Sequence, residues 1–406
     1  MKMKLISSAI ALTLGMGLAE VAIAESAPSP EEMWKIIQQQ QETIETLKSK
    51  LDNTEQKVVA TEEKVAANTV AVEEVEESSG SLLGENTTVG GYGELHYNNL
   101  DGKTDSVDLH RFVLFFGHEF SDKWRFFSEL EVEHALAGDD KPGEVELEQA
   151  YLEYDINATN HVKAGLYLVP VGLINETHEP PTFYGVERNS VEKDIIPATW
   201  WEAGIGLNGE VSPGWKYDVM LSSGLETSAA NSYKIRNGRQ KVAKAVAENG
   251  ALTGRIRYTG VPGLEIGVTG QYQQDLTQTE DISANLLEAH IDFERNGFGL
   301  RALYASWWLD DGPALTGPAA IGADRQTGFY IEPSYKFRTP IGEAGVFVRY
   351  QEWNNKAGGN ADDNEQVDIG LNYWPVEDVV FKFDYQFQNE KAGDHDGFNL
   401  GIGYQF

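Results

Sequence analysis

Cysteine is absent from the 406-residue chain, which excludes a disulfide framework and any metal site built on thiolates. Beyond the amino terminus, the sequence has no run of about 18 apolar residues, which excludes a helical membrane protein. Basic residues are scarce, since 32 Lys and Arg stand against 64 Asp and Glu. This excess of negative charge argues against nucleic acid or an anionic membrane surface as a partner.

Catalytic and cofactor motifs are also missing. The eight histidines show no HExxH spacing, and the chain has neither a GxSxG elbow nor a nucleotide-binding loop. We therefore expect no enzymatic activity, no cofactor and no metal site. Acidic pairs such as Asp139-Asp140 could hold divalent cations that bridge lipopolysaccharide. Solvated loop charge is the simpler interpretation of these pairs.

The amino terminus has the pattern of a secretory signal peptide, which we assign to residues 1–24. Lys2 and Lys4 precede an apolar stretch at 5–18, and Ala22-Ile23-Ala24 forms a small-residue cleavage site. A buried first helix is the alternative interpretation. The signal predicts a mature protein that begins near Glu25 and leaves the cytoplasm.

Residues 25–82 are expected to form a coiled-coil stalk and hinge. Between 33 and 75 an apolar residue recurs every seventh position, as coiled coils require. These positions are Ile37, Ile44, Leu51, Val58, Val65 and Val72. Polar residues occupy many of the intervening core positions, which makes a two-stranded zipper unfavourable and favours a trimer. A partly disordered acidic linker is the alternative.

From about residue 86 the period changes to two, as in the closing segment 397–406 with Phe398, Leu400, Ile402 and Tyr404 on one face. High glycine content (41 residues) is typical of many strands with tight turns. The sixteen strands that we predict cover residues 87–97, 106–119, 124–136, 145–156, 161–169, 200–211, 215–224, 250–260, 264–274, 285–295, 298–308, 326–337, 344–353, 365–374, 379–388 and 397–406.

The connections between these strands alternate between short turns and long acidic loops. Residues 157–160 and 261–263 are typical short turns, whereas 225–249 and 309–325 are long. A transmembrane barrel sorts its connections in this way, with short turns in the periplasm and long loops outside. The sequence therefore predicts an all-β transmembrane barrel of about 16 antiparallel strands over 86–406.

The third long loop, residues 170–199, is rich in proline, aromatic and charged residues. A loop of this length in a compact unit is usually functional or disordered. We expect it to fold inward and constrict the lumen, although a lid on the outer rim or a subunit contact is also compatible with its composition. Its candidate constriction residues are Glu176, Glu187, Arg188, Glu192, Lys193 and Asp194.

Charged residues on the strands are expected to face the lumen, because charge on the lipid face is costly. The first candidates for the pore lining are Arg111, Arg125, Glu129, Glu131, Glu133 and Lys163. The same logic adds Arg255, Arg257, Arg301, Arg349, Lys382 and Asp384. Rows of opposite charge would set the ion preference, although any aqueous lumen needs polar residues. Trp200, Trp201, Trp307, Trp308, Trp353 and Trp374 lie at strand ends and predict an interfacial aromatic girdle.

Three segments give the chain a family resemblance. Gly90–Glu94, Asp122–Phe126 with the following Glu129-Leu130-Glu131, and Gly165–Leu173 resemble the phosphate-selective porin O and P family. The resemblance implies a trimer of sixteen-stranded channels constricted by the third loop, and some members carry an amino-terminal coiled coil. Selective members often have a lysine two residues before the proline at the start of that loop. This chain has Leu168 there, so we expect a general or weakly selective pore.

These observations predict a trimeric outer-membrane porin that passes small hydrophilic solutes, with its coiled coil in the periplasm. Its expected partners are outer-membrane lipid, lipopolysaccharide and two further copies of the chain. The terminal Phe406 resembles the carboxy-terminal aromatic residue that the barrel assembly machinery is thought to read. The alternative is a structural tether in which the stalk acts and the barrel is only an anchor. An adhesin is a weaker option that rests on loop size.

Overall fold

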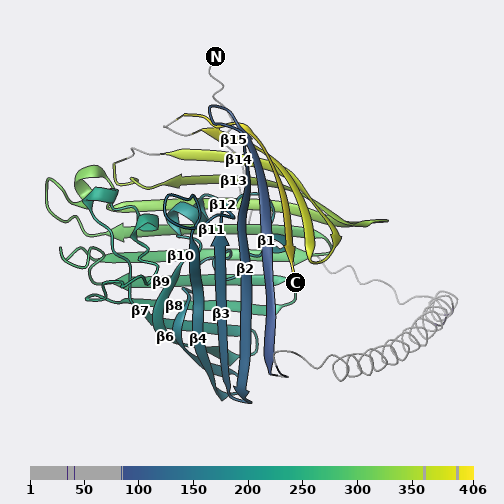
Figure 1. The fold of residues 1–406 in the computed structure, drawn as a ribbon, viewed down its shortest axis with the longest axis horizontal. Coiled ribbons are helices and arrows are strands. Elements are labelled where there is room, and N and C mark those ends of the chain that lie inside the picture. The colour runs from purple at the N-terminus through teal and green to yellow at the C-terminus, as the bar shows by residue number, and fades with distance from the viewer. Residues whose placement is uncertain (1–33, 35–40, 42–83, 85, 360–362, 390–392) are drawn as a thin grey trace. The chain divides into compact units, whose positions relative to one another are not determined.

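Sixteen antiparallel strands form a single closed sheet in the computed structural model (Figure 1). The structure describes residues 34, 41, 84, 86–359, 363–389 and 393–406. The predicted signal peptide and, apart from two isolated positions, the predicted coiled coil lie outside these residues.

The first eight strands are β1 (Thr87–Leu100), β2 (Ser106–Ser121), β3 (Trp124–Glu133), β4 (Val145–Asn157), β5 (Asn160–Leu168), β6 (Trp201–Ser212), β7 (Trp215–Ser222) and β8 (Ala251–Val261). The second eight are β9 (Leu264–Gln273), β10 (Ala284–Arg295), β11 (Phe298–Leu309), β12 (Arg325–Thr339), β13 (Gly342–Asn354), β14 (Asn364–Val376), β15 (Val379–Asn389) and β16 (Gly397–Gln405). Every predicted strand is present, with both ends within three residues of the predicted ones.

Within the described part of the chain, five short helical segments lie in the loops. They are η1 (Pro180–Thr182), η2 (Val191–Ile195), η3 (Ala229–Asn231), η4 (Ile235–Gly238) and η5 (Pro318–Ile321). Among the residues that the structure describes, none of the helices has the length and apolar character needed to cross a membrane.

The first and last strands close the barrel. β1 pairs antiparallel with β16 from Tyr92 opposite Gln405 to Leu100 opposite Gly397. The backbones of Gly91 and Phe406 exchange two further hydrogen bonds, each 2.9 Å long. Because every strand has two neighbours, the described sheet has no unpaired edge. The predicted role of the closing segment in sealing the wall is confirmed.

The outer face of the barrel wall is apolar and the inner face is polar, which is the reverse of the arrangement in a soluble protein. On β14, Ile369 (48% exposed) and Leu371 (41%) point outward, whereas Asp368 and Asn372 point inward and are buried. On β16, Leu400 and Ile402 face outward, and the small residues Gly401 and Gly403 face inward. An apolar outer face with a polar inner face is the pattern of a barrel that sits in lipid.

Connections at the two ends of the barrel differ in length, as predicted. Seven two-residue turns, from 122–123 after β2 to 377–378 after β14, lie at one end. The loops at the other end are longer, and two of them dominate. We call residues 169–200 the third loop and residues 223–250 the fourth loop.

The predicted tryptophan girdle is largely wrong. Trp200, Trp201, Trp307, Trp353 and Trp374 are buried, and only Trp308 of the predicted set is exposed. The inward rings help to pack the third loop, and those of Trp200 and Trp307 lie 6.2 Å apart. Outward aromatic pairs near the short turns are instead Trp124 with Tyr154 and Trp215 with Tyr258. A side chain at the end of a strand can point to either face of the sheet. The position of a tryptophan at a strand end therefore did not determine whether its ring points inward or outward.

Candidate permeation path and the third loop

The third loop crosses the interior of the barrel. His178 lies beside Glu129 of β3, with 3.5 Å between Nε2 and Oε1. Further along the loop, the carbonyl oxygen of Ile195 accepts a 3.0 Å hydrogen bond from Trp307 Nε1 of β11. β3 and β11 lie half a circumference apart in the closed strand order. Only a loop inside the barrel reaches both, so the predicted inward folding is what the structure shows.

One carboxylate connects two parts of the third loop with each other and with the barrel wall. Glu192 is fully buried, and its Oε1 accepts hydrogen bonds from the backbone N–H groups of Leu173 (2.6 Å) and Ile174 (2.8 Å). Its Oε2 accepts from Tyr330 of β12 at 2.8 Å and from Asn189 at 3.1 Å. Glu192 was expected in the constriction, but all of its acceptor capacity serves to hold the loop in place.

A second attachment runs along β13 to β15. Arg349 donates to the carbonyl oxygen of Tyr184 at 2.6 Å, and Asn372 donates to that of Phe183 at 3.1 Å. Asp384 accepts from the backbone N–H of Val186 at 2.6 Å. Wall side chains therefore satisfy the backbone of the loop where it has no strand partner.

Inward glycines provide the room for this attachment. A Cβ atom added at Gly403 would overlap Pro180, and one at Gly401 would lie 3.2 Å from Val186. On β13, a Cβ atom at Gly345 would overlap the Tyr184 hydroxyl. The small residues of the closing strand thus allow the third loop to approach the wall closely.

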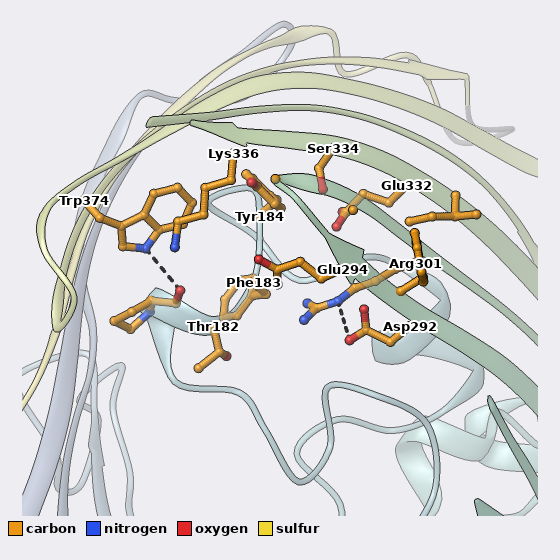
Figure 2. Close-up of a pocket in the computed structure, with 15 residues that line it drawn as sticks. Thr182, Phe183, Tyr184, Asp292, Glu294, Arg301, Glu332, Ser334, Lys336 and Trp374 are labelled. Carbon is orange, nitrogen blue, oxygen red and sulfur yellow. Dashed lines mark hydrogen bonds and ion pairs between the residues drawn. The ribbon is translucent and has the colours of Figure 1, made fainter. Parts of the chain in front are cut away.

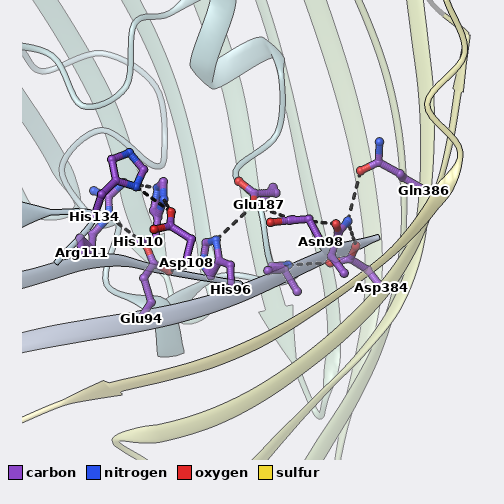
Figure 3. Close-up of polar contacts among 12 residues, drawn as sticks. Glu94, His96, Asn98, Asp108, His110, Arg111, His134, Glu187, Asp384 and Gln386 are labelled. Atoms are coloured by element: carbon purple, nitrogen blue, oxygen red, sulfur yellow. Dashed lines mark hydrogen bonds and ion pairs between the residues drawn. The ribbon is translucent and has the colours of Figure 1, made fainter. Parts of the chain in front are cut away.

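Glu187 joins the loop to β1, and Figure 3 shows this contact. Its Oε1 accepts from Asn98 Nδ2 at 3.2 Å and lies 3.1 Å from His96 Nδ1. On the other side of the ring, His96 Nε2 lies 3.1 Å from Glu94, which is paired with Arg111 at 2.8 Å. The predicted residue Glu187 and the predicted residue Arg111 therefore belong to one polar chain on the inner wall.

Most strand charges on the inner wall are neutralised in pairs. Arg125 binds Glu153 and Asp155, both at 2.6 Å, and Lys163 lies 3.7 Å from Glu153. Further pairs join Arg111 to Glu131, Arg255 to Asp218 and Glu176, Arg257 to Glu265, Arg301 to Asp292, and Arg349 to Glu332. Paired charges of this kind contribute little net field along the lumen.

Three arginines of the third and fourth loops are different. Arg188 donates to the Thr199 hydroxyl at 3.2 Å, and Arg236 donates to the carbonyl oxygens of Lys193 (2.6 Å) and Ala198 (3.2 Å). Arg239 donates to the carbonyl oxygen of Thr199 at 2.5 Å. Among the described residues, none of the three has a carboxylate within ion-pair distance. Burial, and after it the neighbouring Arg236, lower the pKa of Arg239 to about 10.

Two adjoining cavities open between the third loop and the wall near the short turns. One of about 190 Å³ is lined by Tyr184, Lys336 and Trp374, as Figure 2 shows. The second, of about 490 Å³, is lined by Glu176, Arg255 and Arg257. Both contain Asp292 and Arg301, so together they form a charged space beneath the loop.

The remaining predicted residues are spread over the interior. Glu129 and Glu131 are buried on β3, Glu133 is half-buried, Lys193 is exposed and Asp194 is half-buried. Burial by itself would lower the pKa of His178, but the neighbouring Glu129 and Glu148 raise it to about 9.

Sequence reasoning missed Glu148, Arg236 and Arg239. A β-bulge directs Glu148, and the two arginines lie in a loop without periodicity, so no local signal marked them.

No family model matches the chain. A protein of Aquifex aeolicus, described only as uncharacterized, is 31% identical over 350 residues, which cover 79% of this chain and 80% of the relative. The chain belongs to the family of this Aquifex protein. The more specific resemblance to the phosphate-selective O and P family is not confirmed by a family model.

Several solved structures have the same fold as this chain. An anion-selective porin from Comamonas acidovorans has a TM-score of 0.57 at 10% identity, over 79% of this chain and 99% of that one. The trimer form of OmpT, an outer membrane protein of Vibrio cholerae, has a TM-score of 0.51 at 11% identity, with the same two coverages. At such low identity the similarity shows that the chain has the fold of outer-membrane porins.

Proposed function

We propose that this protein is an outer-membrane porin through which small hydrophilic solutes and ions diffuse passively. The observation that carries the proposal is the closed barrel with an apolar outside, a charged inside and a loop that crosses the interior. The third loop narrows the path, and the charged cavities beneath it form the section toward the short turns. No catalytic step is part of this proposal.

A homotrimer is the assembly that we propose. OmpT of Vibrio cholerae, which has the same fold, is described in a trimer form, and the heptad composition of 33–75 favours three strands. Under this proposal the signal peptide directs export, the coiled coil lies in the periplasm, and the apolar outer face contacts lipid and lipopolysaccharide. The tether alternative depends on residues outside the described ones, so no observation here favours it.

Passive conduction is tested by adding purified, folded protein to a planar lipid bilayer. We expect discrete conductance steps and, in a salt gradient, a reversal potential that indicates anion preference. The sign follows from Arg188, Arg236 and Arg239, whose charge is not neutralised by a neighbouring carboxylate. Folded protein without conductance steps would contradict the pore, whereas cation preference would contradict only the role of the arginines.

Deletion of Phe406 is expected to reduce the yield of folded barrel more than the conductance of the barrels that form. In the structure the residue contributes two backbone hydrogen bonds to Gly91, and its side chain is exposed on the barrel surface. An exposed terminal ring remains available to the assembly machinery. Heat-modifiable mobility on a denaturing gel measures the folded fraction, and replacement of exposed Phe387 by leucine serves as a control. A normal folded yield after the deletion would rule out this role.

A further inference from the structure

Three buried side chains converge at the junction between the third loop and the wall. Glu129 of β3, Glu148 of β4 and His178 of the loop are 2%, 1% and 3% exposed. His178 Nε2 lies 3.5 Å from Glu129 Oε1 and 3.7 Å from Glu148 Oε2. None of these three atoms has a hydrogen-bond partner among the described residues. Buried polar atoms are rarely left in this condition.

The neighbouring groups hold the three side chains in the orientation that metal ligands need. His178 Nδ1 lies 3.1 Å from the carbonyl oxygen of Asn175, so Nδ1 carries a proton, and loss of the Nε2 proton leaves a lone pair on Nε2 that is directed at the two carboxylates. Glu129 Oε2 accepts a 2.7 Å hydrogen bond from Gln149. Supporting hydrogen bonds on the far side of a histidine and a carboxylate are typical of bound metals.

A β-bulge brings the second carboxylate to this place. Glu129 pairs with Gln149 and Leu130 with Leu147, so Glu148 is the extra residue on β4. Because of the bulge, both Gln149 and Glu148 reach the interior, one to orient Glu129 and the other to face His178. Bulges that redirect a side chain are frequent beside functional sites.

We propose that Glu129, Glu148 and His178 bind one divalent transition-metal ion of the zinc class. A tetrahedral ion with bonds of about 2.0–2.1 Å needs ligand atoms about 3.3–3.4 Å apart, close to the two measured separations. One imidazole and two carboxylates suit zinc, cobalt or manganese better than calcium, and the fourth position is left for water.

The bound ion would fasten the third loop to the wall, because it joins His178 of the loop to two strands. Binding displaces the proton from Nε2 of His178, so metal affinity falls as the pH is lowered. The sequence predicted no metal site, since the three ligands are at 129, 148 and 178 without a short recognisable spacing.

Two other histidine clusters have suitable residue types, but in each of them an arginine contacts one or more of the ligand residues. In the group of Asp108, His110 and His134 (Figure 3), Arg111 donates to His110 Nε2 at 3.0 Å, so His110 Nδ1 carries a proton. In the group of Glu153, Asp155 and His161, Arg125 already binds both carboxylates. At both places an arginine contacts a ligand residue directly, and this contact disfavours the binding of a metal cation.

The test measures metal content and does not depend on conduction, so its failure would leave the proposed pore intact. Purified full-length protein is stripped with a chelator, loaded with Zn²⁺, desalted and analysed for zinc, and Co²⁺ is followed by its absorption bands. We expect one tightly bound ion per chain and cobalt bands typical of four- or five-coordinate geometry. Folded wild-type protein that retains no zinc would overturn the proposal.

Variants then locate the ion. H178N, E129Q and E148Q are each expected to weaken Zn²⁺ binding more than about 100-fold, whereas the matched controls H134N and H161N should retain one ion per chain. Heat-modifiable mobility establishes that each variant is folded. If a variant at the site does not fold, the wild-type cobalt spectrum and the two control variants still decide the question. Loss of zinc in H134N or H161N, with H178N unaffected, would overturn the assignment.

Discussion

Replacement of Glu192 by alanine is expected to release the third loop and to increase single-channel conductance. The substitution leaves the N–H groups of Leu173 and Ile174 and the hydroxyl of Tyr330 without their acceptor. Each unsatisfied buried donor costs about 1–3 kcal/mol, so the three together reach about 3–9 kcal/mol. The barrel has its own strand pairing, so the loop, rather than the wall, is expected to give way.

The loop's release can be measured in two ways. Limited proteolysis should cleave within residues 169–200 in E192A but not in the wild type, and single-channel recording should show larger or noisier steps. E179A is the matched control, because it removes the same charge from the same loop and the Glu179 side chain makes no hydrogen bond to another described residue. E192Q keeps an oxygen acceptor and should be intermediate. An E192A channel indistinguishable from E179A in both measurements would show that Glu192 does not hold the loop.

The double substitution R236Q/R239Q is expected to reduce anion preference by about fivefold. Glutamine can still donate a hydrogen bond to the loop carbonyl oxygens, so the change removes charge with little effect on the local fold. A unit charge about 4 Å from a permeating ion contributes about 1 kcal/mol even in bulk water. Reversal potentials in a salt gradient measure the effect.

Salt dependence separates an electrostatic effect from a change in pore shape. The difference in anion preference between R236Q/R239Q and the wild type should diminish at about 1 M salt, where the Debye length is about 3 Å. R338Q is the matched control, since the Arg338 side chain is 91% exposed at the short-turn end of β12. Equal reversal potentials for the double variant and wild type at low salt would contradict the proposed role of the two arginines.

The sequence predicted the wall better than the interior. The strand positions could be predicted because the two-residue period and the turn residues are local features of the sequence. A barrel wall that faces lipid requires this period in every strand and a turn between strands. The inward direction of charges such as Arg111 and Glu129 followed from the same period. The inward direction of the tryptophans did not follow, because a ring at a strand end can pack on either face. The buried apolar cluster that includes Trp307 is built partly from loop residues such as Val191 and Ile235.

By itself, the sequence determined a sixteen-stranded barrel, the alternation of its connections and the small inward face of the closing strand. Only the tertiary structure decided what those small residues serve, namely the close approach of Pro180 and Val186 to Gly403 and Gly401. It also decided that Glu192 holds the third loop in place through buried hydrogen bonds. The tertiary structure likewise places Glu148 beside His178, and Arg236 and Arg239 beside the third loop. These contacts join residues far apart in the chain, and loops and bulges have no period from which such pairings can be calculated.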